Sequence, residues 1–104
     1  TDEDRERYRK LYALIDKVPP RAKIVSSENI VPHVSSRPDS YTLRQDLFDA
    51  EYLLFELPVR GDEQAHVKRA LSGDFGVLAA ELPFVLAQRG YSKKENGPIL
   101  RKVR

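Results

Sequence analysis

Five side chains of different chemistry lie close together between residues 29 and 41. They are an amide, an imidazole, a hydroxyl, a guanidinium and a phenol: Asn29, His33, Ser35, Arg37 and Tyr41. Histidine can act as an acid, a base or a hydrogen-bond donor, arginine binds anions, and hydroxyls orient polar ligands. This composition predicts a polar binding site. The alternative is a loop whose side chains satisfy its own backbone, with His33 and Arg37 holding the turn.

The polar stretch connects two short predicted strands, residues 22–26 and 40–43. In an α/β domain, the connection after a parallel strand lies at the carboxyl end of that strand, where ligand-binding crevices form. The sequence therefore predicts that any binding crevice includes this stretch.

A second hypothesis uses the same stretch for catalysis, with Glu28 and His33 as the reactive groups of a small stand-alone hydrolase. No Gly-x-Ser-x-Gly motif is present, so the sequence provides no strained elbow for a serine nucleophile. Glu51 and Glu56 face opposite sides of one predicted strand and cannot form a catalytic pair from that strand alone. His66 has no second histidine at helical spacing, so no metal site is predicted.

The remaining chain predicts the elements that would position these residues. Apolar residues recur at three- and four-residue spacing from Tyr8 to Val18, which predicts a helix over residues 2–17. The compact apolar run at residues 51–57 is typical of a central strand covered on both faces. Further predicted elements are a helix from Asp62 to about Ser72, capped by Asp62, and an antiparallel hairpin of Phe75–Ala80 and Phe84–Gln88.

This alternation of helices and strands favours an α/β fold. We expect a small Rossmann-like, mainly parallel sheet with flanking helices and a C-terminal antiparallel hairpin. Residues 1–90 would form a single domain, and residues 91–104 a basic tail with one short extended piece at Ile99 and Leu100. The glycine fingerprint of dinucleotide-binding proteins is absent, so no cofactor is predicted.

Charge and composition exclude several functions. The net charge of +2 is too small to indicate a nucleic-acid-binding protein. The absence of cysteine excludes disulfides, thiolate metal ligands and thiol nucleophiles, and no apolar run could cross a bilayer. The chain opens without methionine, so we expect it to be a piece of a longer protein. The cations after residue 88 are opposed only by Glu95, which leaves open a solvated terminus or a contact with anionic lipid.

One group of residues resembles a known family. The order is Pro-Pro, a strand ending in Ser, Asn-Ile-Val-Pro-His-Val-Ser-Ser-Arg and then a tyrosine in the next strand. It is similar to the C-terminal region of the DUF2079 family, which are uncharacterised polytopic membrane proteins of prokaryotes. The Ala-Glu-Tyr-Leu-Leu-Phe-Glu strand and Phe-Gly-Val at residues 75–77 fit as well, so the resemblance covers about residues 10–90. One departure is Thr42-Leu43, where the family has an aromatic residue followed by proline.

The resemblance implies an extracytoplasmic domain attached to a bundle of membrane helices, in the cell membrane. The membrane portion of such proteins is similar in layout to glycosyltransferases that use lipid-linked sugars. In that arrangement the catalytic acids belong to the membrane portion, and this domain is accessory. The leading hypothesis is therefore a non-catalytic domain that binds a glycan, polymer or lipid-linked substrate through Asn29, His33, Ser35, Arg37 and Tyr41. Its partner would be the membrane portion of the same polypeptide, and the oligomeric state stays open.

Overall fold

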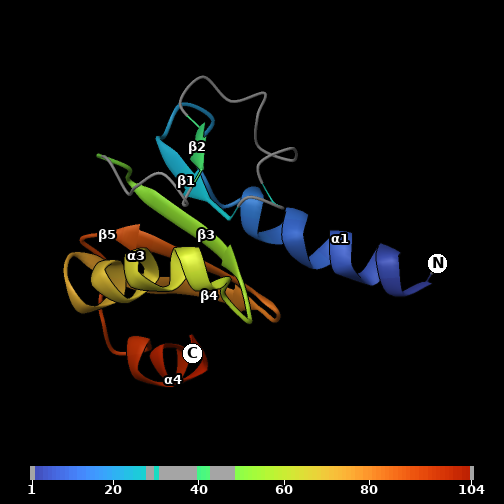
Figure 1. Ribbon diagram of the computed structural model, residues 1–104. Coiled ribbons are helices and arrows are strands. Elements are labelled where there is room, and N and C mark those ends of the chain that lie inside the picture. The colour runs from blue at the N-terminus through green and yellow to red at the C-terminus, as the bar shows by residue number, and fades with distance from the viewer. Residues whose placement is uncertain (1, 28–29, 31–39, 43–48, 104) are drawn as a thin grey trace.

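A computed structural model describes residues 2–27, 30, 40–42 and 49–103, with backbone only for 40–42. The described residues form three helices and five strands, and the last helix lies at the C-terminal end (Figure 1). In chain order the elements are α1 (Asp2–Ile15), β1 (Ile24–Ser26), β2 (Ser40–Thr42), β3 (Tyr52–Glu56), α3 (Gly61–Ser72), β4 (Phe75–Glu81), β5 (Phe84–Arg89) and α4 (Asn96–Lys102).

The strands form one sheet in the order β2-β1-β3-β5-β4. β1 pairs in parallel with both β2 and β3, whereas β5 pairs antiparallel with both β3 and β4. The α/β class is confirmed, and so is the C-terminal hairpin, but the sheet is mixed rather than mainly parallel. The reason is the short turn at Leu82-Pro83, because a parallel connection needs a crossover of a dozen or more residues. β5 therefore folds back and lies between β3 and β4.

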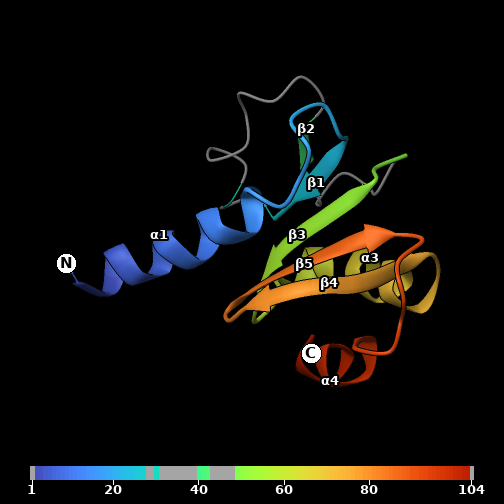
Figure 2. The same cartoon turned by 180° about the vertical axis from the view of Figure 1, so that it is seen from behind.

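Side chains of β3 alternate between two apolar clusters. Tyr52 and Leu54 belong to the cluster that α1 covers, whereas Leu53 and Phe55 belong to the cluster that α3 and α4 cover. Figures 1 and 2 show α1 and α3 on opposite sides of the sheet. All four of these side chains are buried, so the prediction of a strand covered on both faces is confirmed. Burying both faces of β3 removes most of its apolar surface from water, which is the main driving force for this packing.

The predicted helices at the N-terminus and after β3 are present, but their ends differ in detail. α1 ends at Ile15, two residues before the predicted end. α3 begins at Gly61, and its N-cap residue is Arg60, which makes no side-chain capping hydrogen bond. The predicted cap by Asp62 is therefore wrong. Asp62 lies in the first turn instead, where its negative charge interacts favourably with the positive end of the helix dipole.

The C-terminal segment differs from the sequence-based expectation. Residues 96–102 form helix α4 rather than an extended piece, and Ile99 and Val103 join the core beneath α3. Pro98 lies in the first turn of α4, where a missing N–H leaves no helical hydrogen bond unmade. The buried Asn96 amide donates to the carbonyls of Leu71 and Phe75 at 2.8 and 2.9 Å. Its Oδ1 accepts from the Val77 N–H at 2.8 Å, so this one side chain joins α3, β4 and α4.

The start of β4 is in close contact with the segment before α4. A Cβ atom placed on Gly76 would lie 2.1 Å from the carbonyl oxygen of Ser92 and 2.4 Å from that of Tyr91. Both neighbours are backbone atoms, which cannot rotate away as a flexible side chain could. Only glycine therefore lets the chain pass this closely along the edge of β4.

We expect Gly76→Ala to lower the free energy of unfolding by about 2 kcal/mol or more, as overpacking does in a close-packed interior. Gly97→Ala is the matched control, because nothing lies within 4 Å of its added methyl group. Alanine in that exposed helical position should be neutral or stabilising by up to about 1 kcal/mol. Urea unfolding followed by circular dichroism measures both. Equal effects of the two substitutions would show that the 91–96 segment does not pack on β4.

Candidate functional site

The carboxyl ends of β1 and β3 lie side by side because the two strands are parallel. Ser26 is level with Leu54 in the sheet, and the next residue, Ser27, donates its N–H to the Leu54 carbonyl at 3.1 Å. The Ser27 hydroxyl accepts a long hydrogen bond from the Glu56 N–H at 3.4 Å. Ile30 then donates its N–H to the Ser27 carbonyl at 2.8 Å, so the chain turns immediately after the strand. The polar stretch predicted from the sequence thus begins at this edge of the sheet.

Ser26 is the most unusual residue of this edge. Its side chain is fully buried, and its hydroxyl has no hydrogen-bond partner among the residues that the structure describes. An unsatisfied buried hydroxyl costs about 1–3 kcal/mol, so such a group is normally completed by another polar group or by water. Ser26 was not among the site residues predicted from the sequence. The signal available was its position as the last residue of a predicted strand, directly before the polar stretch.

Glu56 is held by a partner from α1. The Arg7 guanidinium binds both carboxylate oxygens, with Nη2 2.9 Å from Oε1 and Nη1 in contact with Oε2. The guanidinium carbon also lies 4.9 Å from the centroid of the Phe84 ring, a favourable cation–π distance. Hydrogen bonding to Glu56 raises the pKa of Arg7 above its ordinary value. Both oxygens of Glu56 are therefore used to fix α1 on the sheet, which leaves this carboxylate poorly placed to act as a base.

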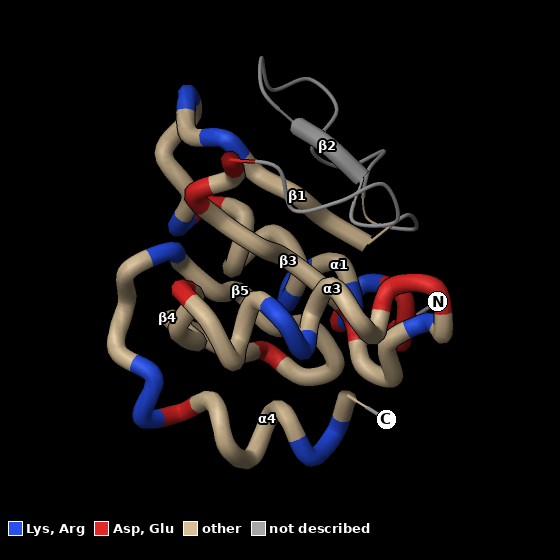
Figure 3. The backbone as a smooth tube through the Cα atoms, turned by 60° about the vertical axis from the view of Figure 1, so that its left-hand side comes forward, with Lys and Arg blue, Asp and Glu red and all other residues tan. Residues whose placement is uncertain are grey.

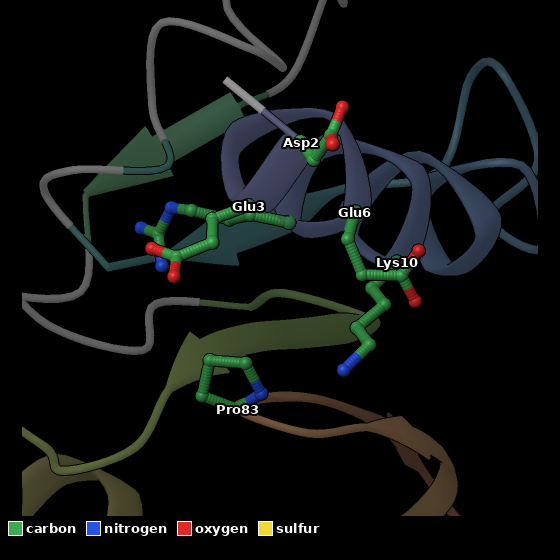
Figure 4. Close-up of a pocket in the computed structure, with 6 residues that line it drawn as sticks. Asp2, Glu3, Glu6, Lys10 and Pro83 are labelled. Atoms are coloured by element: carbon green, nitrogen blue, oxygen red, sulfur yellow. The ribbon is translucent and has the colours of Figure 1, made fainter.

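A surface pocket of about 420 Å³ opens beside this ion pair, between α1 and the β4–β5 turn (Figure 4). Its lining residues are Asp2, Glu3, Glu6, Arg7, Lys10 and Pro83. Three of its charged groups already have partners, and the first is Arg7, which binds Glu56. Lys10 Nζ donates to the Leu82 carbonyl at 3.1 Å, and Arg9 binds the Glu6 carboxylate at 2.5 and 3.0 Å.

The hydrogen bond from Arg9 lowers the pKa of Glu6 below its ordinary value, so Glu6 stays ionised at neutral pH. Glu6 therefore has no proton to donate at neutral pH, and both of its carboxylate oxygens are bound by Arg9. Its charges fasten the first half of α1 to itself and to the hairpin turn.

Among the described residues, neither a metal-binding cluster nor a membrane-spanning helix is found. Within residues 2–27 and 49–103, no three His, Asp or Glu side chains gather as a metal site would require. His66 accepts a hydrogen bond from Arg69 at 3.0 Å, one helical turn away on α3. In the same described ranges, each helix falls short of the length and apolar character needed to span a bilayer.

Most of the predicted site residues lie outside the described residues. These are Asn29, His33, Ser35 and Arg37, together with Glu28 of the catalytic alternative. Tyr41 is placed by its backbone alone, in β2, where it pairs with Val25 of β1. The structure thus describes both strands that flank the polar stretch, and the predicted role of the stretch itself stays a prediction.

Comparison of the chain with protein-family models, with curated proteins and with solved structures finds no match. The resemblance to the DUF2079 family therefore stays an expectation from the sequence.

A double-mutant cycle on Arg7 and Glu56 tests whether this pair fixes α1 to the sheet. We expect Arg7→Ala and Glu56→Gln to be coupled by about 1–2 kcal/mol, because two charge-assisted hydrogen bonds are lost together. Part of the gain is screened by solvent, since the Arg7 side chain is 39% exposed. The free energy of unfolding in urea, at low and high salt, is the measurement.

The matched control is the exposed pair Arg9 and Glu6, whose side chains are 65% and 51% exposed. We expect their coupling to be clearly smaller than that of Arg7 and Glu56, because solvent screens an exposed pair one helical turn apart. The assignment would fail if the two cycles gave the same coupling energy.

Proposed function

We propose that this chain is a non-catalytic accessory domain that binds a glycan or another polymer at the carboxyl edge of its parallel strands. The observation that carries the proposal is the parallel pairing of β1 with strands on both sides. Because of that pairing, the chain leaves β1 at Ser26 and Ser27, and the polar stretch follows directly after these two hydroxyls. Such edges are where α/β sheets bind ligands.

The chemistry of this edge supports binding better than catalysis. The described groups are two hydroxyls and a carboxylate, and the carboxylate of Glu56 is occupied by Arg7. The polar stretch adds an amide, an imidazole and a guanidinium. Hydroxyls, amides and guanidinium groups hydrogen-bond the many hydroxyls and acidic groups of a carbohydrate without any need for a base of shifted pKa.

Attachment to a membrane protein, with the domain on the extracytoplasmic side, is supported by the resemblance to the DUF2079 family alone. The Rossmann-like layout belongs to the same proposal. Strands β2, β1 and β3 would be its parallel half, and the hairpin of β4 and β5 would complete the sheet. The membrane portion of the same polypeptide would be the partner.

An NMR titration of the ¹⁵N-labelled chain tests the binding site. The probes are maltohexaose, a neutral oligosaccharide, and an oligomer of galacturonic acid, an anionic one. We expect shifts of the backbone amides of Ser26, Ser27 and Glu56 with at least one probe. His33→Ala combined with Arg37→Ala should weaken that binding about tenfold or more, equivalent to about 1.4 kcal/mol.

The control for this experiment is His66→Ala combined with Arg69→Ala, which removes the same two residue types from α3, a helix outside the proposed site. The control should leave the affinity unchanged. Binding that shifts other regions, or that both double variants weaken equally, would refute the site. Mass spectrometry of the same samples distinguishes the hydrolase alternative, in which the probe is cleaved and Glu28→Gln stops the cleavage.

A further inference from the structure

The C-terminal part of the structure carries a group of cations that the proposed binding site does not use. We name the exposed side chains of Lys93, Lys94, Arg101 and Lys102 the α4 surface. None of the four has an ion-pair partner among the described residues, and Glu95 is the one acid from residue 91 to residue 103. Elsewhere the structure pairs many of its cations with acids: Arg7, Arg9, Lys23, Arg60 and Arg89. The α4 surface therefore presents concentrated positive charge to its surroundings.

The packing of α4 fixes these cations in place. Ile99 and Val103 are buried against the core, one helical turn apart. Because they define the inner side of the helix, the exposed residues Arg101 and Lys102 lie on its outer side. The three hydrogen bonds of Asn96 hold the start of the helix. Figure 3 shows positive charge at both ends of α4, in the segment that leads into it and in its last turn.

An aromatic residue stands beside the cations. Tyr91 is 42% exposed and lies two residues before Lys93. Tyrosine is enriched where one end of a side chain meets apolar material and the other meets water, as at the headgroup level of a membrane. Pro98 is exposed on the helix between the two pairs of cations. The surface thus combines cations with one amphipathic ring.

We propose that the α4 surface docks on a bilayer that contains anionic lipid. Each lysine or arginine near such a surface strengthens binding about fivefold. The attraction falls off with distance over about one Debye length, which shortens as salt is added. Four cations opposed by one acid give reversible, salt-sensitive binding. Binding along a nucleic-acid strand would use a series of stacking rings, whereas Tyr91 is the one aromatic residue after residue 89. The α4 surface lies beside β4, at one edge of the sheet, whereas the proposed polymer site lies at β1 and β3. Either proposal can therefore fail without the other.

Flotation of the 104-residue chain with vesicles tests this docking. One set of vesicles contains phosphatidylcholine alone, and the other contains phosphatidylcholine with phosphatidylglycerol. We expect binding to the second set at about 0.01 M salt and its loss at about 1 M salt. Lys94→Glu combined with Arg101→Glu should reduce the bound fraction at least about tenfold, because two attractive charges become repulsive.

The control is Lys17→Glu combined with Arg21→Glu, which changes the net charge equally at two exposed positions outside α4. It should keep most of the binding, and NMR shifts of the unmodified chain on small vesicles should be confined to residues 91–103. Inorganic phosphate at the concentration of the lipid phosphate should not compete. The proposal is overturned if the unmodified chain does not bind the anionic vesicles, or if both double variants lose the same fraction of binding. Competition by free phosphate would also overturn it, as would tighter binding to a single-stranded oligonucleotide than to the vesicles.

Discussion

Parallel pairing on both sides of β1 is the constraint on which the rest of this structure depends. Hydrogen bonds hold both ends of its alignment with β3. Near the start, the Lys23 carbonyl accepts the N–H groups of Glu51 and Tyr52, and the Lys23 ammonium binds Asp49 at 2.5 Å. At the other end, Ser27 donates its N–H to Leu54. A strand fixed in this way determines where its two connections start and end, and therefore where the polar stretch meets the sheet.

Two apolar layers follow from the same central strands. The cluster under α1 is fastened at its rim by the Arg7–Glu56 pair, whereas the cluster under α3 is closed by α4 and its buried Asn96. Polar groups thus take part in both layers, and each is satisfied by hydrogen bonds. Ser26 is different, because its buried hydroxyl has no such partner among the described residues. A further polar contact at the carboxyl edge of β1 would therefore satisfy the Ser26 hydroxyl.

Sequence patterns predicted the elements whose burial is strongly periodic or continuous. The stripe of α1, the apolar run of β3 and the β4–β5 hairpin are of this kind. Helix α4 was missed because Gly97-Pro98 is typical of a loop, although proline is well tolerated in a first helical turn. The spacing of Ile99 and Val103 was the available signal. The Arg7–Glu56 pair joins residues 49 positions apart and could not be predicted without the sheet order. The site residues from Asn29 to Arg37 stay a prediction.

Interstrand contacts in the labelled chain, measured as nuclear Overhauser effects, test the central claim most directly. The account predicts that Val25 contacts both Leu53 and Tyr41 in a parallel pattern, with neighbouring residues in the same register. Such contacts would bring the polar stretch to the carboxyl edge of the sheet, beside Ser27. An antiparallel pattern, or a Tyr41 without any contact to β1, would contradict the account and remove the basis for a site at that edge.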